Sequence, residues 1–143
     1  MKTVALRFAD NFAPEKGTIA AHNDMINEYG YVWYGKLGNA VSNKVMNEIM
    51  KGDNPRILLI HSGKTGRYWA YLDKIQHEIP EKECIPAYYR DNANAFKTWF
   101  KINRIVPAAK DVLSKCVVAS SQRPLAEASK SSMSPYFIIE VRE

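Results

Sequence analysis

The stretch ILLIHSGKTGRYWAYL, residues 57–72, constrains the fold more than any other part of the chain. Residues 57–62 are mostly apolar, residues 63–66 have the composition of a tight turn, and residues 67–75 alternate between apolar or aromatic and polar side chains. Two such runs joined by a short glycine-containing turn are typical of a β-hairpin. The pattern therefore predicts two antiparallel strands within a β-sheet.

The Ser-Gly-Lys-Thr sequence in this turn also resembles part of a phosphate-binding loop. Such a loop needs a glycine five residues before its Gly-Lys element, so that free backbone amides can surround a phosphate. In this chain the corresponding position is Leu58, inside the apolar run that predicts a buried strand. The turn therefore indicates a hairpin and not a nucleotide triphosphate site.

The composition is that of a globular protein. The chain has 143 residues, of which 46% are hydrophobic and 24% charged, and it contains no run of about 20 apolar residues that would suit a membrane span. The N-terminal apolar run is interrupted by Arg7 and Asp10, which argues against a secretory signal. We expect one soluble, cytoplasmic domain over residues 1–143 that has no association with a membrane.

The net charge and the two cysteines indicate which kinds of ligand the chain is suited to bind. A net charge of +5 and a pI near 9.2 favour polyanionic partners. Cys84 and Cys116 have neither metal-ligand spacing nor a Cys-x-x-Cys arrangement, so we expect two free thiols. The sequence predicts no metal site and no cofactor.

The remaining elements follow from turn residues and periodicity. Thr18 and Gly30 delimit one predicted helix, and Pro107 opens another. The predicted strands are residues 3–8, 31–37, 97–106 and 135–141 beside the hairpin, the predicted helices are 18–29, 42–51 and 107–116, and residues 78–94 and 119–134 are predicted connections. This order has too few helices for a doubly wound sheet, so it predicts an α+β fold, a small mixed β-barrel with helices packed outside.

Several strand motifs, taken in order, are similar to those of the PUA-like superfamily. YVWYGKLGN resembles the first strand of YTH domains, residues 57–72 resemble the YTH and EVE hairpin, WFKINRIVP resembles the strand that precedes a proline in YTH domains, and LSKCVVASSQRPL resembles the segment after it. The similarity covers roughly residues 30–141. It implies a single PUA-like domain of the YTH or EVE type.

The resemblance implies binding of a modified base, such as N6-methyladenine or 5-methylcytosine, in an aromatic cage of a DNA or RNA reader. Some bacterial relatives serve as specificity modules of restriction or defence systems, which implies a larger effector protein as a further partner. On matched positions, Lys36 and Asn39 would lie at the pocket rim, Ser62 at the strand end beside it, and Lys101 on the strand before the proline. The cage tryptophans of YTH domains are absent from the matched positions, and Tyr88 and Tyr89 suggest a tyrosine-lined pocket instead.

The residues themselves offer further candidates for base contacts. A flipped base is held by stacking on aromatic faces and by hydrogen bonds to its edge. Trp33, Trp69 and Trp99 lie on predicted strands, where successive side chains point to opposite faces, so we expect some rings to face outward. The stacking candidates are Trp33, Trp69, Tyr88 and Tyr89. Ser120 and Arg123 could donate to a base edge or a phosphate, and a core or loop role remains an alternative for each of these residues.

Two other functions stay open at this stage. The ASCH branch of PUA-like proteins makes a small nuclease or amidohydrolase the second hypothesis, although His61 beside Ser62 is the only adjacent pair of interest and the two should face opposite ways. The third is a protein-interaction module with an aromatic surface. A reader that contacts phosphates should lose affinity steeply with salt, whereas an interaction module should bind nucleic acid weakly and without that dependence.

Overall fold

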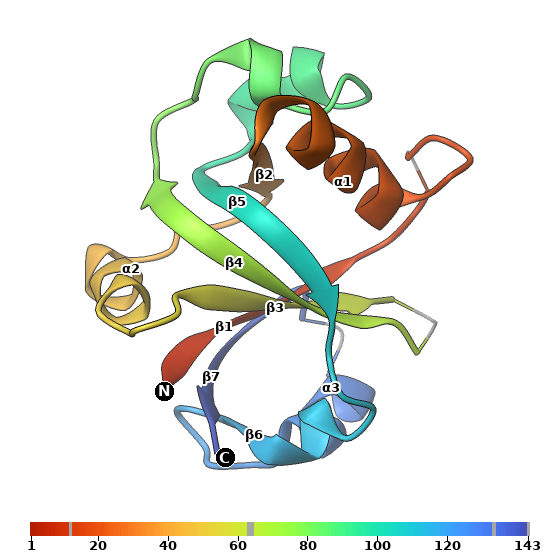
Figure 1. Ribbon diagram of the computed structural model, residues 1–143. Helices are drawn as coiled ribbons and strands as arrows, with labels where there is room; N and C mark the ends of the chain where they lie inside the picture. The colour runs from red at the N-terminus through yellow and green to blue at the C-terminus, as the bar shows by residue number, and fades with distance from the viewer. Residues whose placement is uncertain (12, 63–64, 133, 143) are drawn as a thin grey trace.

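The computed structural model of the protein describes residues 1–11, 13–62, 65–132 and 134–142. Within these residues a single curled sheet has the strand order β2-β5-β4-β3-β1-β7-β6 (Figure 1). The strands are β1 (Lys2–Phe8), β2 (Val32–Lys36), β3 (Arg56–His61), β4 (Arg67–Gln76), β5 (Thr98–Pro107), β6 (Cys116–Val118) and β7 (Tyr136–Val141). The β1–β3 pair is parallel and the other pairs are antiparallel.

The predicted α+β composition is confirmed, and the predicted barrel is only partly so. The described sheet stays open, because β2 and β6 are its two edges and do not pair with each other. A register shift beside Leu72 in the β4–β5 pair bends the two longest strands, as β-bulges do. The resulting curl places β2 and β5 above β1 and β7, so an interior forms without a closed ring of hydrogen bonds (Figure 1).

Three α-helices lie outside the curl in the described chain: α1 (Thr18–Tyr29), α2 (Asn43–Met50) and α3 (Leu125–Ser131). The predicted bounds of the first helix are correct, with Gly30 ending it in the left-handed conformation at φ 86°. Asp10 accepts a hydrogen bond from the backbone N–H of Thr18 at 2.9 Å and so caps α1 from outside the helix. Ser42 caps α2 through its hydroxyl, which accepts from the N–H of Val45 at 3.2 Å. No described helix has the length and apolar character that crossing a membrane requires.

The C-terminal third departs from expectation. The helix predicted at 107–116 is wrong, because β5 continues through Pro107, the 3-10 helix η3 spans Val112–Lys115, and Cys116 starts β6. Pairing of β6 with β7 overrides the local pattern here. The connection predicted at 119–134 contains α3, which buries Leu125 and Ala128 against the sheet one helical turn apart. Cys84 and Cys116 are both free, as predicted, and both are buried.

The expectation that some strand tryptophans face outward is wrong for two of the three. Trp33 and Trp99 are 3% and 0% exposed, and their neighbours Tyr34 and Phe100 are buried on the opposite side of the sheet. The reason is that both faces of β2 and β5 are covered. The interior of the curl covers one face, and the other packs against the connection that carries 3-10 helices η1 (Lys82–Cys84) and η2 (Arg90–Ala95).

Candidate functional site

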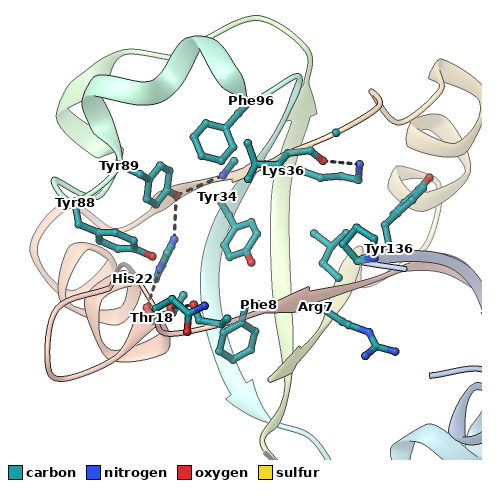
Figure 2. Close-up of a pocket in the computed structure, with 17 residues that line it drawn as sticks. Arg7, Phe8, Thr18, His22, Tyr34, Lys36, Tyr88, Tyr89, Phe96 and Tyr136 are labelled. Carbon is teal, nitrogen blue, oxygen red and sulfur yellow. Dashed lines mark hydrogen bonds between the residues drawn. The ribbon is translucent and has the colours of Figure 1, made fainter. Parts of the chain in front are cut away.

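A cavity of about 560 Å³ opens between β1, α1, β2, the start of β7 and the connection before β5 (Figure 2). Six aromatic side chains contribute rings to its lining. The rings come from Phe8, Tyr34, Tyr88, Tyr89, Phe96 and Tyr136. Arg7, Asn11, Thr18, His22 and Lys36 add polar groups. We refer to this site as the aromatic cavity.

The connection before β5 delivers three of these rings as a packed group. The Tyr88 and Tyr89 rings meet edge to face with centroids 4.9 Å apart, and the Tyr89 ring lies 5.1 Å from that of Phe96. Phe96 in turn packs on Trp99, whose ring is fully buried, at 5.4 Å. Edge-to-face contacts of this kind add stability beyond area burial. The outer ring, Tyr88, therefore rests on a wall that is anchored in the core.

A chain of hydrogen bonds fixes Tyr89 against α1 and β2. Its hydroxyl donates to the carbonyl of Trp33 at 3.0 Å, and the N–H of Gly35 lies 3.4 Å from the same oxygen. Nε2 of His22 lies 3.1 Å from this hydroxyl, and Nδ1 of His22 is 2.8 Å from the carbonyl of Thr18. Because a carbonyl can only accept, Nδ1 carries the proton and the unprotonated Nε2 is an acceptor. The single O–H proton of Tyr89 is therefore shared between Nε2 and the Trp33 carbonyl. Burial lowers the pKa of His22 from 6.5 to about 4, so the ring is neutral at neutral pH.

Gly35 allows the Phe96 ring to lie directly on β2. A Cβ at this position would stand 2.8 Å from Cγ of Phe96 and 3.0 Å from Cζ3 of Trp99. Both distances are shorter than van der Waals contact allows, and the obstructing atoms belong to packed rings. The absence of a side chain at Gly35 thus shapes one wall of the cavity.

Lys36 is buried beside the cavity, with 7% of its surface exposed. Its ammonium donates to the carbonyls of Leu37 at 3.1 Å and Asn39 at 2.7 Å, and lies 4.3 Å from the centroid of the Tyr136 ring. Burial lowers the pKa of Lys36. Since two carbonyls and one aromatic face surround a group with three N–H bonds, this charge holds the loop after β2 in place.

Arg7, like Lys36, is hydrogen-bonded to backbone carbonyls of the protein itself. Its guanidinium donates to the carbonyl of Ser132 at 2.9 Å and to that of Ser129, both at the C-terminal end of α3. A cation is favourable at this end of a helix because the unpaired carbonyls carry partial negative charge. Both basic groups of the lining are therefore hydrogen-bonded to backbone carbonyl oxygens of the protein itself.

A comparison with known protein families identifies the family of the chain. A family model described as Pua-like matches residues 4–137 of the chain. The chain belongs to the Pua-like family. No curated protein and no solved structure matches it. The family is associated in general with nucleic-acid binding, and the PUA-like resemblance of the sequence motifs is confirmed at this level.

Among the residues singled out in the sequence of this Pua-like chain, three line the aromatic cavity: Lys36, Tyr88 and Tyr89. Asn39 lies beside it and contributes its backbone carbonyl to Lys36. Trp33 is in the core behind the cavity wall, where its carbonyl receives the Tyr89 hydroxyl.

The other candidates lie away from the cavity of the Pua-like chain. Ser62 is exposed beyond β3, and Trp69 is half-buried beneath Arg56, whose guanidinium carbon is 4.7 Å from the ring centroid. The ammonium of Lys101 lies 4.3 Å from the centroid of the Tyr31 ring.

Two further candidates belong to the C-terminal part of the fold. Ser120 lines a separate groove of about 480 Å³ together with Lys2 and Lys44. Arg123 is exposed and its Nε lies 3.9 Å from a carboxylate oxygen of Glu127, an ion pair between residues four apart in the sequence. Neither residue lines the aromatic cavity.

Sequence reasoning missed four of the six rings: Phe8, Tyr34, Phe96 and Tyr136. Tyr34 could have been found from the local sequence. Residues two apart on a strand share a face, and Lys36 was already a candidate for the site. Phe8 and Tyr136 had none. Pairing of β1 with β7 sets Leu6 opposite Tyr136, and only the sheet order of the Pua-like chain reveals that neighbourhood.

Proposed function

We propose that this Pua-like protein binds nucleic acid and holds one modified base in the aromatic cavity. The observation that carries the proposal is the convergence of six aromatic rings from separate segments on one cavity of about 560 Å³. This volume lies within the usual range of small-ligand sites, which are mostly apolar with a few placed polar groups. Stacking on aromatic faces is also how proteins hold a base that has left its helix.

The charge state of the lining supports an uncharged base as the ligand. His22 is neutral at neutral pH, and the cations of Lys36 and Arg7 are already bound by carbonyl oxygens. Burial raises the pKa of Tyr34, which keeps that phenol uncharged as well. A methyl group on the base would meet aromatic carbon here, which favours a methylated base such as N6-methyladenine or 5-methylcytosine.

Two residues have the clearest roles in this proposal. Tyr88 is the ring we assign to stacking, because it is half-buried and Tyr89 supports it from behind at 4.9 Å. Asn11 is exposed at the lining, and its amide carries both donors and an acceptor for the edge of a base. A role as the recognition module of a restriction or defence system extends the proposal and rests on the motif resemblance.

The hydrolase alternative finds less support in the described histidines. Nε2 of His61 lies 2.6 Å from Oδ2 of Asp10, and Nδ1 lies 2.8 Å from the carbonyl oxygen of Ser62. Both ring nitrogens of His61 thus lie within hydrogen-bond distance of oxygen atoms of the protein itself. The same Asp10 also caps α1, which gives the pair a structural role.

The test is a fluorescence-anisotropy titration with matched oligonucleotides, single- and double-stranded, that carry adenine, N6-methyladenine, cytosine or 5-methylcytosine, at two salt concentrations. We expect a preference of tenfold or more for one modified base, about 1.4 kcal/mol, and weaker binding at the higher salt concentration. Tyr88→Ala should reduce the affinity for that base by about 1–3 kcal/mol. Tyr29→Ala is the matched control, because Tyr29 is an exposed tyrosine outside the cavity lining.

Several outcomes would overturn the proposal. Equal affinity for modified and unmodified oligonucleotides would remove the modified base as ligand. A loss of the same size in Tyr88→Ala and Tyr29→Ala would place binding elsewhere on the surface. No binding at low salt would remove nucleic acid altogether and leave a protein-interaction module as the leading function.

A further inference from the structure

Leu37, at the rim of the aromatic cavity, is exposed to an unusual degree for an apolar residue. Its exposed fraction is 59%, the largest among the large hydrophobic side chains that the structure describes. It lies in the loop between β2 and α2 and contributes to the cavity lining together with Gly38. The cavity that we propose for the base thus has an unburied leucine at its edge.

The loop that presents Leu37 is held firmly in one conformation. The buried ammonium of Lys36 binds the carbonyls on either side of Gly38, at 3.1 Å and 2.7 Å, and Gly38 adopts φ 81°, which glycine adopts without strain. The far end of the loop is anchored as well, because the N–H of Val41 donates to the hydroxyl of Thr98 at 2.9 Å. A buried lysine and a left-handed glycine are therefore used to fix a loop whose most prominent side chain packs on nothing that would bury it.

Such a side chain suits one task beside a base-binding cavity. When a base leaves a duplex, its neighbours lose stacking contacts, and proteins offset that loss by inserting an apolar side chain between base steps. A rigid loop favours insertion because little conformational freedom is lost on binding.

We propose that Leu37 is an apolar wedge that enters the space vacated by the base held in the aromatic cavity, so that the preferred ligand is double-stranded nucleic acid. This inference rests on the proposed function, and it adds the class of substrate. A protein that captures a base from a single strand needs no wedge. An unpaired base has no partner on an opposite strand, so its removal leaves no gap in a duplex to be filled. The wedge should therefore matter for duplexes alone.

The experiment compares Leu37→Ser, Leu37→Met and Ile79→Ser with the unaltered protein. The ligands are a duplex and a single strand that carry the modified base preferred in the titration above, with 2-aminopurine placed next to that base. Ile79 is the matched control, since it is 43% exposed and lies outside the cavity lining. Denaturant unfolding of each variant verifies that the fold is retained.

We expect Leu37→Ser to weaken duplex binding tenfold or more and to change single-strand binding by less than about twofold. Leu37→Met should keep most of the duplex affinity, because methionine is also bulky and apolar, and Ile79→Ser should bind as the unaltered protein does. The rise in 2-aminopurine fluorescence that reports unstacking should be smaller with Leu37→Ser.

The results that overturn the inference are distinct from failure of the proposed function. An equal loss on duplex and single strand would make Leu37 an ordinary part of the cavity wall, and no loss on the duplex would leave it without a role. Binding of single strands alone, still dependent on Tyr88, would keep the proposed function and remove the wedge. Binding of neither ligand by the unaltered protein would remove both.

Discussion

The hydroxyl of Tyr89 lies 3.1 Å from Nε2 of His22, and this contact joins the connection before β5 to helix α1. The same hydroxyl donates to the carbonyl of Trp33 on β2, and Nδ1 of His22 donates to the carbonyl of Thr18. Three elements from different parts of the chain are thereby linked through two side chains at the wall of the aromatic cavity (Figure 2). The cavity is consequently a preformed part of the fold.

Removal of the Tyr89 hydroxyl should destabilise the protein although the ring remains. Tyr89→Phe leaves Nε2 of His22 and the carbonyl of Trp33 without this partner, and unsatisfied buried polar groups cost about 1–3 kcal/mol. We expect a decrease of that size in the free energy of unfolding, measured with urea. Tyr29→Phe, at an exposed tyrosine, should change it by less than about 0.5 kcal/mol. Similar effects of the two substitutions would show that the hydrogen-bond chain does not stabilise the fold.

Stability should fall with acidification because of His22. The pKa of His22 is lowered to about 4 in the folded protein from an ordinary value of 6.5, so the unfolded chain binds the proton more tightly. The free energy of unfolding therefore rises as the pH increases from about 4 to 6.5. This contribution of His22 to stability is lost as the pH falls through the same window. A shift of this size corresponds to about 3 kcal/mol.

The measurement is urea unfolding at intervals from neutral pH to about pH 4. His22→Gln lacks the titrating ring, so its stability should change much less over the same window. Asp10 contributes only at lower pH, since its pKa is lowered from 3.8 to about 2, chiefly by the hydrogen bond with His61. An unchanged pH dependence in His22→Gln would contradict the assignment.

Gly35 should tolerate no side chain. The Cβ of Gly35→Ala would collide with the Phe96 and Trp99 rings, and such overpacking typically costs about 1–3 kcal/mol. Gly52→Ala is the matched control, because the nearest atom to a Cβ there is the carbonyl oxygen of Ile49 at 3.6 Å, an ordinary contact.

A double substitution tests the cause of that destabilisation. Phe96→Ala removes the ring that lies closest to the added Cβ. Gly35→Ala should therefore cost less in a Phe96→Ala background than in the unaltered protein, and the difference is obtained from a double-mutant cycle of unfolding free energies. Additive effects would show that the two positions do not compete for the same space.

Local structure was predictable wherever the signal lay within a few residues. Helix α1 has the bounds that Thr18 and Gly30 predict, and the β3–β4 hairpin lies where the alternation after the apolar run places it, with residues 63 and 64 of its turn outside the described residues. The helix predicted at 107–116 is wrong because the apolar residues of this segment suit a helix or a strand, and pairing of β6 with β7 decides between them.

The residues of the candidate site were likewise predictable only in part. Tyr88 and Tyr89 stood out in the sequence as adjacent tyrosines in a long connection, and both line the aromatic cavity. Trp33 and Trp99 had equally strong compositional signals and lie in the core, because the 3-10 helices of that connection cover the outer face of β2 and β5. Burial of a strand residue depends on what covers each face, and no window of sequence contains that information.

The sequence by itself determined the α+β class, most element boundaries and the PUA-like resemblance, since capping residues, turn residues and periodicity act on neighbouring positions. The tertiary structure alone decided the aromatic cavity. Phe8 and Tyr136 come from opposite ends of the chain, and they meet Tyr34 and Tyr88 because β1 pairs with β7 and the sheet curls over itself. These contacts depend on long-range strand pairing, a property of the whole sheet that local sequence preferences do not specify.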